Sequence, residues 1–204
     1  MNKPDPANVS RETLQRLEAF SDLLIKWNRS INLVSPADIP HLDQRHIADS
    51  AQVFDLAPSD AKTWIDLGTG AGFPGLICAI YAIEQNPDCR FTLIESDGRK
   101  CAFLREAIRL TGAPAEVITN RIERTEASPV DVISARALAP LSKLLNFATQ
   151  FSHPGTTMLF PKGANAESEL TQARADWHIN VERMASVSDS SGTILKLTEV
   201  APLR

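Results

Sequence analysis

The sequence lacks any long hydrophobic run, and this absence excludes one class of protein at once. No apolar stretch approaches the ~20 residues that a helix needs to cross a lipid bilayer. The N-terminus, Met1-Asn2-Lys3-Pro4-Asp5-Pro6, has no apolar core of the kind found in a secretory signal. We therefore expect no membrane segment and a cytoplasmic location.

Cysteine is scarce, with 3 residues in a chain of 204. Cys78, Cys89 and Cys101 are odd in number and form no C-x-x-C pair. Disulfide frameworks and zinc sites need paired or clustered cysteines. We expect each to be a small apolar residue in a reducing compartment, and we expect no bound metal.

Positive charge is also in short supply, because 21 Lys and Arg residues are outnumbered by 25 Asp and Glu residues, for a formal net charge of −4. A protein that grips nucleic acid with its whole surface carries the opposite balance. Composition alone therefore does not predict an RNA partner, although a local basic patch stays compatible with it. The length and the hydrophobic content of 43% are sufficient for one domain with a sizeable core plus a modest extension.

The first 60 residues have a helical pattern. Apolar side chains recur at helical spacing from Leu14 to Ile31, and Ser10 or Asn8 is placed to cap the N-terminus of this helix. Two prolines then interrupt the pattern, and a second helix is predicted from about His41 to Phe54. We expect residues 1–60 to form an N-terminal helical cap.

From residue 61 to 204, short apolar strands alternate with helices. The predicted strands are Thr63–Leu67, Arg90–Glu95, Ala115–Thr119, Val130–Ser134, Thr156–Phe160, Ile179–Val187 and Thr193–Val200. Such alternation predicts an α/β domain whose mostly parallel, doubly wound sheet is covered by helices on both faces. No helix separates the last two strands, so we expect a terminal hairpin and one antiparallel strand among the seven.

A glycine-rich loop joins the first strand to its helix: Asp66-Leu67-Gly68-Thr69-Gly70-Ala71-Gly72. Glycines allow positive φ and close approach of a ligand to the backbone, while the helix N-terminus offers free N–H groups. A plain turn without a ligand is the alternative, but the three glycines that follow an acid favour a ligand platform.

The spacing of the glycines narrows the choice of ligand. A dinucleotide fingerprint would place a glycine where Phe73 stands, and a phosphate-binding P-loop would need a lysine that Gly72-Phe73-Pro74-Gly75 does not contain. The wider loop suits a non-phosphorylated nucleoside that carries an amino acid and a sulfonium, namely S-adenosylmethionine. Glu95 ends the second strand, where it either accepts hydrogen bonds from both ribose hydroxyls or is merely solvated.

Several further motifs lie along the chain in a characteristic order. They are Lys26-Trp27-Asn28 with Ile31-Asn32-Leu33, Arg45-His46-Ile47 with Asp49-Ser50, Asp66 to Gly75, Glu95-Ser96 with Arg99-Lys100 and Phe103-Leu104, Arg121-Ile122-Glu123, Ser134-Ala135-Arg136-Ala137, and Lys162-Gly163. In these motifs, over nearly the whole chain, the sequence resembles the bacterial small-subunit ribosomal RNA guanine-N7 methyltransferases (methyltransferase G, also called glucose-inhibited division protein B).

The resemblance implies a Rossmann-like class I methyltransferase fold, with methyl transfer from S-adenosylmethionine to N7 of a guanine. It implies cofactor contacts at Gly68, Phe73, Ile122, Glu123 and Arg136. The loop argument adds contacts at Gly70, Gly72 and Glu95. Ala135 departs from the family pattern, which often runs directly from serine to arginine.

The chemistry of the acceptor atom separates the possible reactions. None of the three cysteines follows a proline, as a cytosine-C5 nucleophile usually does, and no Asn/Asp-Pro-Pro-aromatic segment follows the fourth strand. Guanine N7 has a free lone pair, so positioning and electrostatics suffice without a general base. His46 or Asp49 could still supply a base, or could serve in capping or packing, and we assign none.

Arg136 and Lys162 are predicted to position the substrate, because both follow strands at the edge where ligands bind in open α/β sheets. A surface salt bridge and a turn are the respective alternatives. We expect ribosomal RNA as the partner, within a small-subunit particle, and a monomeric enzyme. A methyltransferase acting on a protein or small metabolite, or a non-catalytic nucleoside-binding module, remains the alternative function.

Overall fold

The structure is a computed structural model, and it describes residues 9–203. Residues 1–8 of the expected cap, including Asn8, lie outside this range. Within the described range the six α-helices are α1 Arg11–Asn28, α2 Ala48–Leu56, α3 Gly75–Gln85, α4 Gly98–Thr111, α5 Leu141–Ala148 and α6 Ala166–Ala173. Ser10 caps α1, since its side chain accepts a hydrogen bond from the Thr13 N–H at 3.2 Å.

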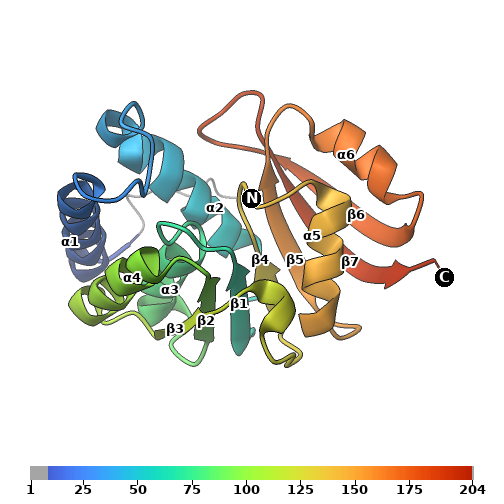
Figure 1. Cartoon of the computed structure of the whole chain (residues 1–204), viewed down its shortest axis with the longest axis horizontal. Helices are drawn as coiled ribbons and strands as arrows, with labels where there is room; N and C mark the ends of the chain where they lie inside the picture. The colour runs from blue at the N-terminus through green and yellow to red at the C-terminus, as the bar shows by residue number, and fades with distance from the viewer. Residues whose placement is uncertain (1–8, 204) are drawn as a thin grey trace.

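Seven strands form one sheet in the order β3-β2-β1-β4-β5-β7-β6 (Figure 1). They are β1 Thr63–Leu67, β2 Arg90–Glu95, β3 Ala115–Thr119, β4 Val132–Ser134, β5 Thr157–Lys162, β6 Trp177–Ala185 and β7 Thr193–Pro202. The strands from β3 to β5 pair in parallel, whereas β7 runs antiparallel to both β5 and β6. The predicted fold class and the terminal hairpin are confirmed.

Side chains alternate between the two faces of the sheet, and each face carries its own core. Trp64 and Val132 belong to a core shared with α1 to α4, whereas their neighbours Ile65 and Ile133 belong to a core shared with α5 and α6. Helices thus cover both faces. The central strands are buried on both sides, which explains why they read as continuous apolar runs in the sequence.

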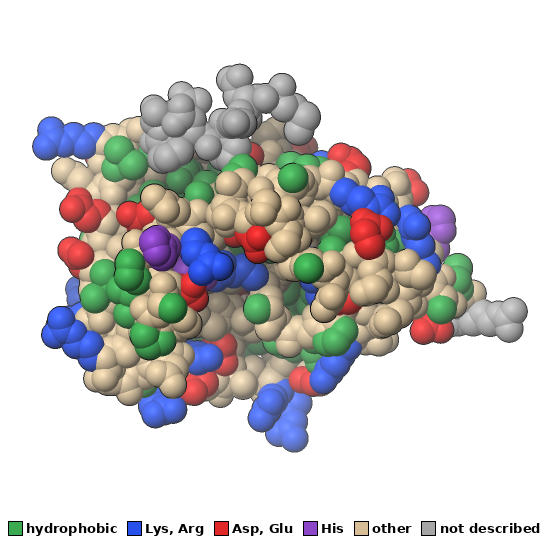
Figure 2. All heavy atoms as spheres, turned by 90° about the horizontal axis from the view of Figure 1, so that it is seen from above, with side chains coloured by type: hydrophobic (Ala, Val, Ile, Leu, Met, Phe, Trp, Pro, Cys, Tyr) green, Lys and Arg blue, Asp and Glu red, His purple; other side chains and the backbone are tan. Residues whose placement is uncertain are grey.

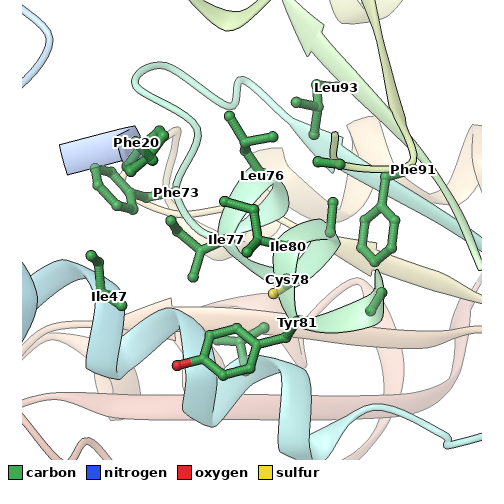
Figure 3. Close-up of a cluster of buried hydrophobic side chains, with 14 of the residues drawn as sticks. Phe20, Ile47, Phe73, Leu76, Ile77, Cys78, Ile80, Tyr81, Phe91 and Leu93 are labelled. Atoms are coloured by element: carbon green, nitrogen blue, oxygen red, sulfur yellow. The ribbon is translucent and has the colours of Figure 1, made fainter. Parts of the chain in front are cut away.

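The N-terminal helices pack directly on the helices of the sheet domain. The Phe20 ring of α1 meets Phe73 edge-on, with 5.6 Å between ring centroids, and lies 6.0 Å from the Phe103 ring of α4. Figure 3 shows Phe20 and Ile47 pointing toward the cluster around Phe73 and α3. Leu14 departs from the predicted apolar stripe, since it is 45% exposed. The chain follows a π-helix, η3 (Asp43–Ile47), into α2.

Cys78, Cys89 and Cys101 are free and buried. No helix among residues 9–203 is long and apolar enough to span a membrane. The sequence placed β1, β2 and β3 at their observed limits, but it ended β5 two residues early. Lys162 is therefore the last residue of β5 and does not follow the strand as predicted.

Candidate active site

The glycine loop forms one wall of a cavity of about 460 Å³. Gly68 and Gly70 line it with φ angles of +63° and +58°, a conformation that glycine adopts without strain. This cavity is called the glycine-loop pocket below. Its other walls come from the ends of β2, β3 and β4 and from the segments that follow them. Phe73, Glu95, Ile122, Glu123 and Arg136 all line it; their contact with a cofactor stays a prediction.

Gly72 was predicted to contact the cofactor, but it does not line the pocket. It has a φ of +95°, and a Cβ atom there would lie 3.0 Å from the Leu76 side chain and 3.4 Å from that of Leu104. Gly72 therefore lets the loop pack closely onto α3 and α4. Its contribution is to the shape of the loop and not to the surface of the pocket.

Asp66 anchors the loop from beneath. Its side chain is fully buried, and it accepts hydrogen bonds from Ser134 Oγ at 2.6 Å and from the Gly75 N–H at 3.2 Å. Burial raises the pKa of this carboxyl to about 6 against the opposing effect of these donors. A side chain at position 75 would overlap the Asp66 carboxyl group, so only glycine fits there. Asp66 thereby ties β1, β4 and the start of α3 together.

Glu95 lies at the carboxyl end of β2, and its side chain is buried against the loop. One carboxylate oxygen accepts from the Gly70 N–H at 3.0 Å, and the other accepts from Ser96 and Asp97 at 2.7 and 2.8 Å. The solvated strand end considered from the sequence is therefore wrong. Each oxygen can accept more than one hydrogen bond, so the carboxylate can hold the loop and still receive ligand hydroxyls.

Arg136 follows β4 and lies where the N-terminal segment meets the loop. Its guanidinium carbon is 4.9 Å from the centre of the Phe73 ring, a cation–π geometry. Its Nη1 is 2.7 Å from Nδ1 of His46. Burial and the neighbouring Arg136 charge lower the pKa of His46 to about 4, so the imidazole is neutral at pH 7 and accepts this hydrogen bond. A neutral histidine and an aromatic ring thus fix the Arg136 guanidinium at the pocket.

Lys162 does not reach the glycine-loop pocket. Its Nζ donates to the Ala139 carbonyl at 2.8 Å and pairs with Glu169 of α6 at 2.9 Å, and the side chain is only 10% exposed. The same Glu169 carboxylate accepts from the Leu141 N–H at 2.8 Å. Lys162 therefore holds both ends of the connection from residue 139 to α5, and its contact with a substrate remains a prediction.

A second cavity, of about 480 Å³, borders the first along residues 136–139, which line both. Asp49 of α2, Ser186, Lys162 and Glu169 contribute side chains to it. Ala137 in the shared segment has a φ of +53°, an uncommon value for a residue other than glycine. This feature was not predicted, and no motif in the sequence brings these distant segments together.

The model of the GidB family, described as rRNA small subunit methyltransferase G, matches residues 13–197. The chain belongs to this family. Curated relatives named Ribosomal RNA small subunit methyltransferase G include one from Rhodospirillum centenum, 53% identical over 95% of this chain and 88% of the relative. Another, from Gluconobacter oxydans, is 52% identical over 94% of this chain and 96% of the relative.

Solved structures resemble the GidB chain in fold. An N-methyltransferase, NodS from Bradyrhizobium japonicum in complex with S-adenosyl-L-homocysteine, superposes with a TM-score of 0.59 over 89% of this chain and 98% of NodS, at 15% identity. An O-methyltransferase from Bacillus cereus, also in complex with this compound, gives a TM-score of 0.59 over 88% of this chain and 90% of its own, at 16% identity. These likenesses confirm the methyltransferase fold.

Two residues of the Lys26-Trp27-Asn28 motif, which contributes to the GidB resemblance, have structural roles. Asn28 accepts hydrogen bonds from the N–H groups of Leu33 and Val34 at 2.8 and 3.0 Å, and both of these residues line the glycine-loop pocket. Trp27 donates to Glu106 at 3.1 Å and packs edge-on against Phe103. The structure thus supports packing for Trp27, while Asn28 shapes a wall of the pocket.

The charges on the face above the carboxyl ends of the strands are mixed. In the space-filling view from that side, Lys and Arg side chains are interspersed with Asp and Glu side chains (Figure 2). On the side chains coloured there, no continuous basic band crosses this face. Arg45 in the N-terminal segment pairs with Asp38 at 2.8 Å.

Proposed function

We propose that this chain transfers a methyl group from S-adenosylmethionine to N7 of a guanine in small-subunit ribosomal RNA. The observation that carries the proposal is the family match over residues 13–197, which includes both cavities and the segment between them. Membership of the family supports the rRNA substrate. The choice of N7 rests on the chemistry of the site.

The glycine-loop pocket fits the cofactor. Its volume lies within the range of ~300–1,000 Å³ typical of ligand pockets. Gly68 and Gly70 offer backbone without side chains for close approach, Glu95 offers a carboxylate for ribose hydroxyls, and Ile122 with Glu123 forms the opposite wall. When bound, the cofactor supplies a methyl carbon on a sulfonium, and the electron pair of the broken carbon–sulfur bond remains on sulfur.

The residues around Arg136 suit an acceptor that needs no deprotonation. His46 is neutral at pH 7, but its Nδ1 is engaged with Arg136, so it is poorly placed to take a proton from a substrate. The guanine N7 lone pair forms the new carbon–nitrogen bond without losing a proton. Arg136 is the catalytic residue of this proposal, since it orients the base, and Lys162 acts by holding Ala139.

We propose that residues 1–60 act as a helical cap that completes the substrate cleft. The part of this segment that the structure describes contributes Leu33 and Val34 to the glycine-loop pocket and Asp49 to the second cavity. The mixed surface charge and the net charge of −4 provide little non-specific electrostatic attraction for RNA. An assembled small-subunit particle in the cytoplasm is therefore the proposed substrate, and a single chain carries the site.

Transfer of labelled methyl groups tests the proposal. The purified chain is incubated with radiolabelled S-adenosylmethionine and either small-subunit particles or naked rRNA from cells that lack the enzyme. Labelled 7-methylguanosine should be recovered after digestion, with more from particles than from naked RNA. Label on adenine or cytosine, or on ribosomal protein alone, would contradict the proposed reaction.

A further inference from the structure

The second cavity has no role in the function argued so far. It shares residues 136–139 with the glycine-loop pocket, so this segment is a common border of the two cavities. A planar ligand in the second cavity would therefore lie beside the cofactor pocket, with Arg136 at the junction. The question is which chemical group the cavity is built to receive.

Three carboxylates line the cavity, and two of them are already engaged. Glu169 accepts from Lys162 and from the Leu141 N–H. Asp189 is exposed, and its carboxylate turns back to accept from the N–H and the hydroxyl of Ser191, both at 2.8 Å. Asp49 is the third. Unlike Glu169 it forms no ion pair with any of residues 9–203, and unlike Asp189 it is half-buried.

Asp49 is half-buried on α2, and one of its oxygens, Oδ1, is fixed by the Ser186 hydroxyl at 2.8 Å. Among residues 9–203, no hydrogen bond or ion pair reaches its other oxygen, Oδ2. Asp49 also favours the charged form of Arg136, against the burial that lowers the pKa of this guanidinium. The cavity thus presents an oriented carboxylate with spare acceptor capacity, next to a cation.

We propose that this cavity binds the target guanine and that Asp49 accepts hydrogen bonds from its N1–H and 2-amino groups. These two donors lie side by side on the Watson–Crick edge and match a carboxylate. Adenine offers a lone pair at N1 in the same place, which a carboxylate repels. N7 lies on the opposite side of the base, and this orientation turns it away from Asp49 and toward the border with the glycine-loop pocket.

The inference rests on the proposed function, since it assigns a recognition residue to that reaction. Selection by a fixed carboxylate is strict, because the wrong base leaves the carboxylate unpaired or facing a lone pair.

Binding of free nucleotides tests the assignment without any methyl transfer. The full-length chain, saturated with S-adenosylhomocysteine, is titrated with GMP, IMP and AMP and followed by NMR. We expect GMP to bind more tightly than AMP by roughly 10- to 100-fold, the discrimination of one bidentate pair. IMP, which lacks the 2-amino group, should lie between them. Asp49→Asn should abolish this ranking, and Ser186→Ala should weaken it.

Asp43→Asn is the matched control, because Asp43 lies on the preceding turn but outside the second cavity; it should leave the ranking intact. The affinity of Asp49→Asn for S-adenosylhomocysteine should stay within about twofold of wild type. A wild-type chain without a preference for GMP, or an Asp49→Asn chain that keeps it, would overturn the assignment. If wild-type enzyme does not methylate rRNA guanine at all, the proposed function fails instead.

Discussion

The two cavities that meet along residues 136–139 are built in different ways. One wall of the glycine-loop pocket is a continuous stretch of main chain, shaped by glycines at positive φ and by the buried Asp66. The second cavity is lined by side chains from α2, β5, α6 and the turn between β6 and β7. A main-chain wall is damaged mainly by adding atoms to its glycines, whereas a side-chain wall is damaged by exchanging single polar groups.

The largest loss of ligand affinity is expected where the main chain itself forms the wall of the pocket. Gly68→Asp adds a side chain at a φ of +63°, with its Cβ 2.6 Å from Leu138, and places a carboxylate at the pocket wall. Calorimetry should show a loss of S-adenosylhomocysteine affinity of about 100-fold or more, from strain and lost space together. Gly98→Ala is the matched control, since nothing lies within 4 Å of its added Cβ. Unchanged binding by Gly68→Asp would show that the loop is wrongly placed.

The second-largest effect is expected at residues 136–139, because a change in this shared border should affect both cavities. Arg136→Ala removes a guanidinium that packs on Phe73 and leaves His46 Nδ1 without its partner. Methyl transfer should fall by about 100-fold, as for the loss of one preorganised charged donor. Arg136→Lys should restore part of it, because the charge remains without the planar fork. Single-turnover rates with labelled cofactor measure both, and full activity of the alanine variant would remove Arg136 from the mechanism.

A substitution of Lys162 tests whether the second cavity depends on the buried Lys162–Glu169 ion pair. Lys162→Met leaves Glu169 without its cation, which should lower the free energy of unfolding by about 1–3 kcal/mol and methyl transfer by less than about tenfold. Arg183→Met is the matched control, because Arg183 of β6 pairs with Glu167 of the same helix α6. This pair is exposed, and its loss should cost under about 1 kcal/mol. Urea unfolding and transfer assays report the two effects. A far larger loss of transfer at unchanged stability would indicate direct contact with the substrate.

The smallest effect concerns the pH response of His46. Its folded pKa of about 4 lies below the ordinary value of 6.5, so between these pH values the unfolded chain binds a proton that the folded chain does not. The free energy of unfolding therefore falls as the pH drops through this window. His46→Asn removes this contribution. As the pH falls from 6.5 to 4, the free energy of unfolding of the variant should rise by about 1 kcal/mol relative to that of wild type.

The relevant measurement is the difference between the two unfolding curves. Asp66 has the opposite sign, because its raised pKa of about 6 stabilises the fold as the pH falls from 6 toward 4. It is present in both proteins and cancels in the difference. Asp38, Asp49 and Arg45 also act on His46 and are likewise common to both. Parallel curves for the variant and wild type would contradict a neutral His46.

The sequence predicted the limits of some strands better than those of others. β1, β2 and β3 have the expected limits, because apolar runs end there at clear turn residues. The other four strands differ from the prediction: β4 begins two residues later, β5 and β7 end two residues later, and β6 lies two residues nearer the N-terminus. β6 and β7 form an antiparallel hairpin with an irregular register between His178 and Asn180. In such strands alternation is incomplete, and the limits depend on the pairing partner.

The predicted site residues also fall into two groups, those that line the pocket and those that do not. Gly68, Gly70, Phe73, Glu95, Ile122, Glu123 and Arg136 line the pocket that the motifs predicted. Gly72 allows the loop to pack closely onto α3 and α4, and Lys162 binds Ala139 and Glu169. A motif indicates that a residue matters at a position. It does not distinguish a residue that contacts the ligand from one that supports the structure around the ligand.

The sequence by itself determined the fold class, the glycine-loop pocket and the family, because these depend on local backbone conformation and on short contiguous motifs. Only the tertiary structure decided which charges are free. It paired Lys162 with Glu169, joined Arg136 to a neutral His46, and placed Asp49, which pairs with no cation among residues 9–203, in a cavity lined by segments far apart in the sequence. The pairing of charges is a matter of distance in space, which spacing along the chain does not fix.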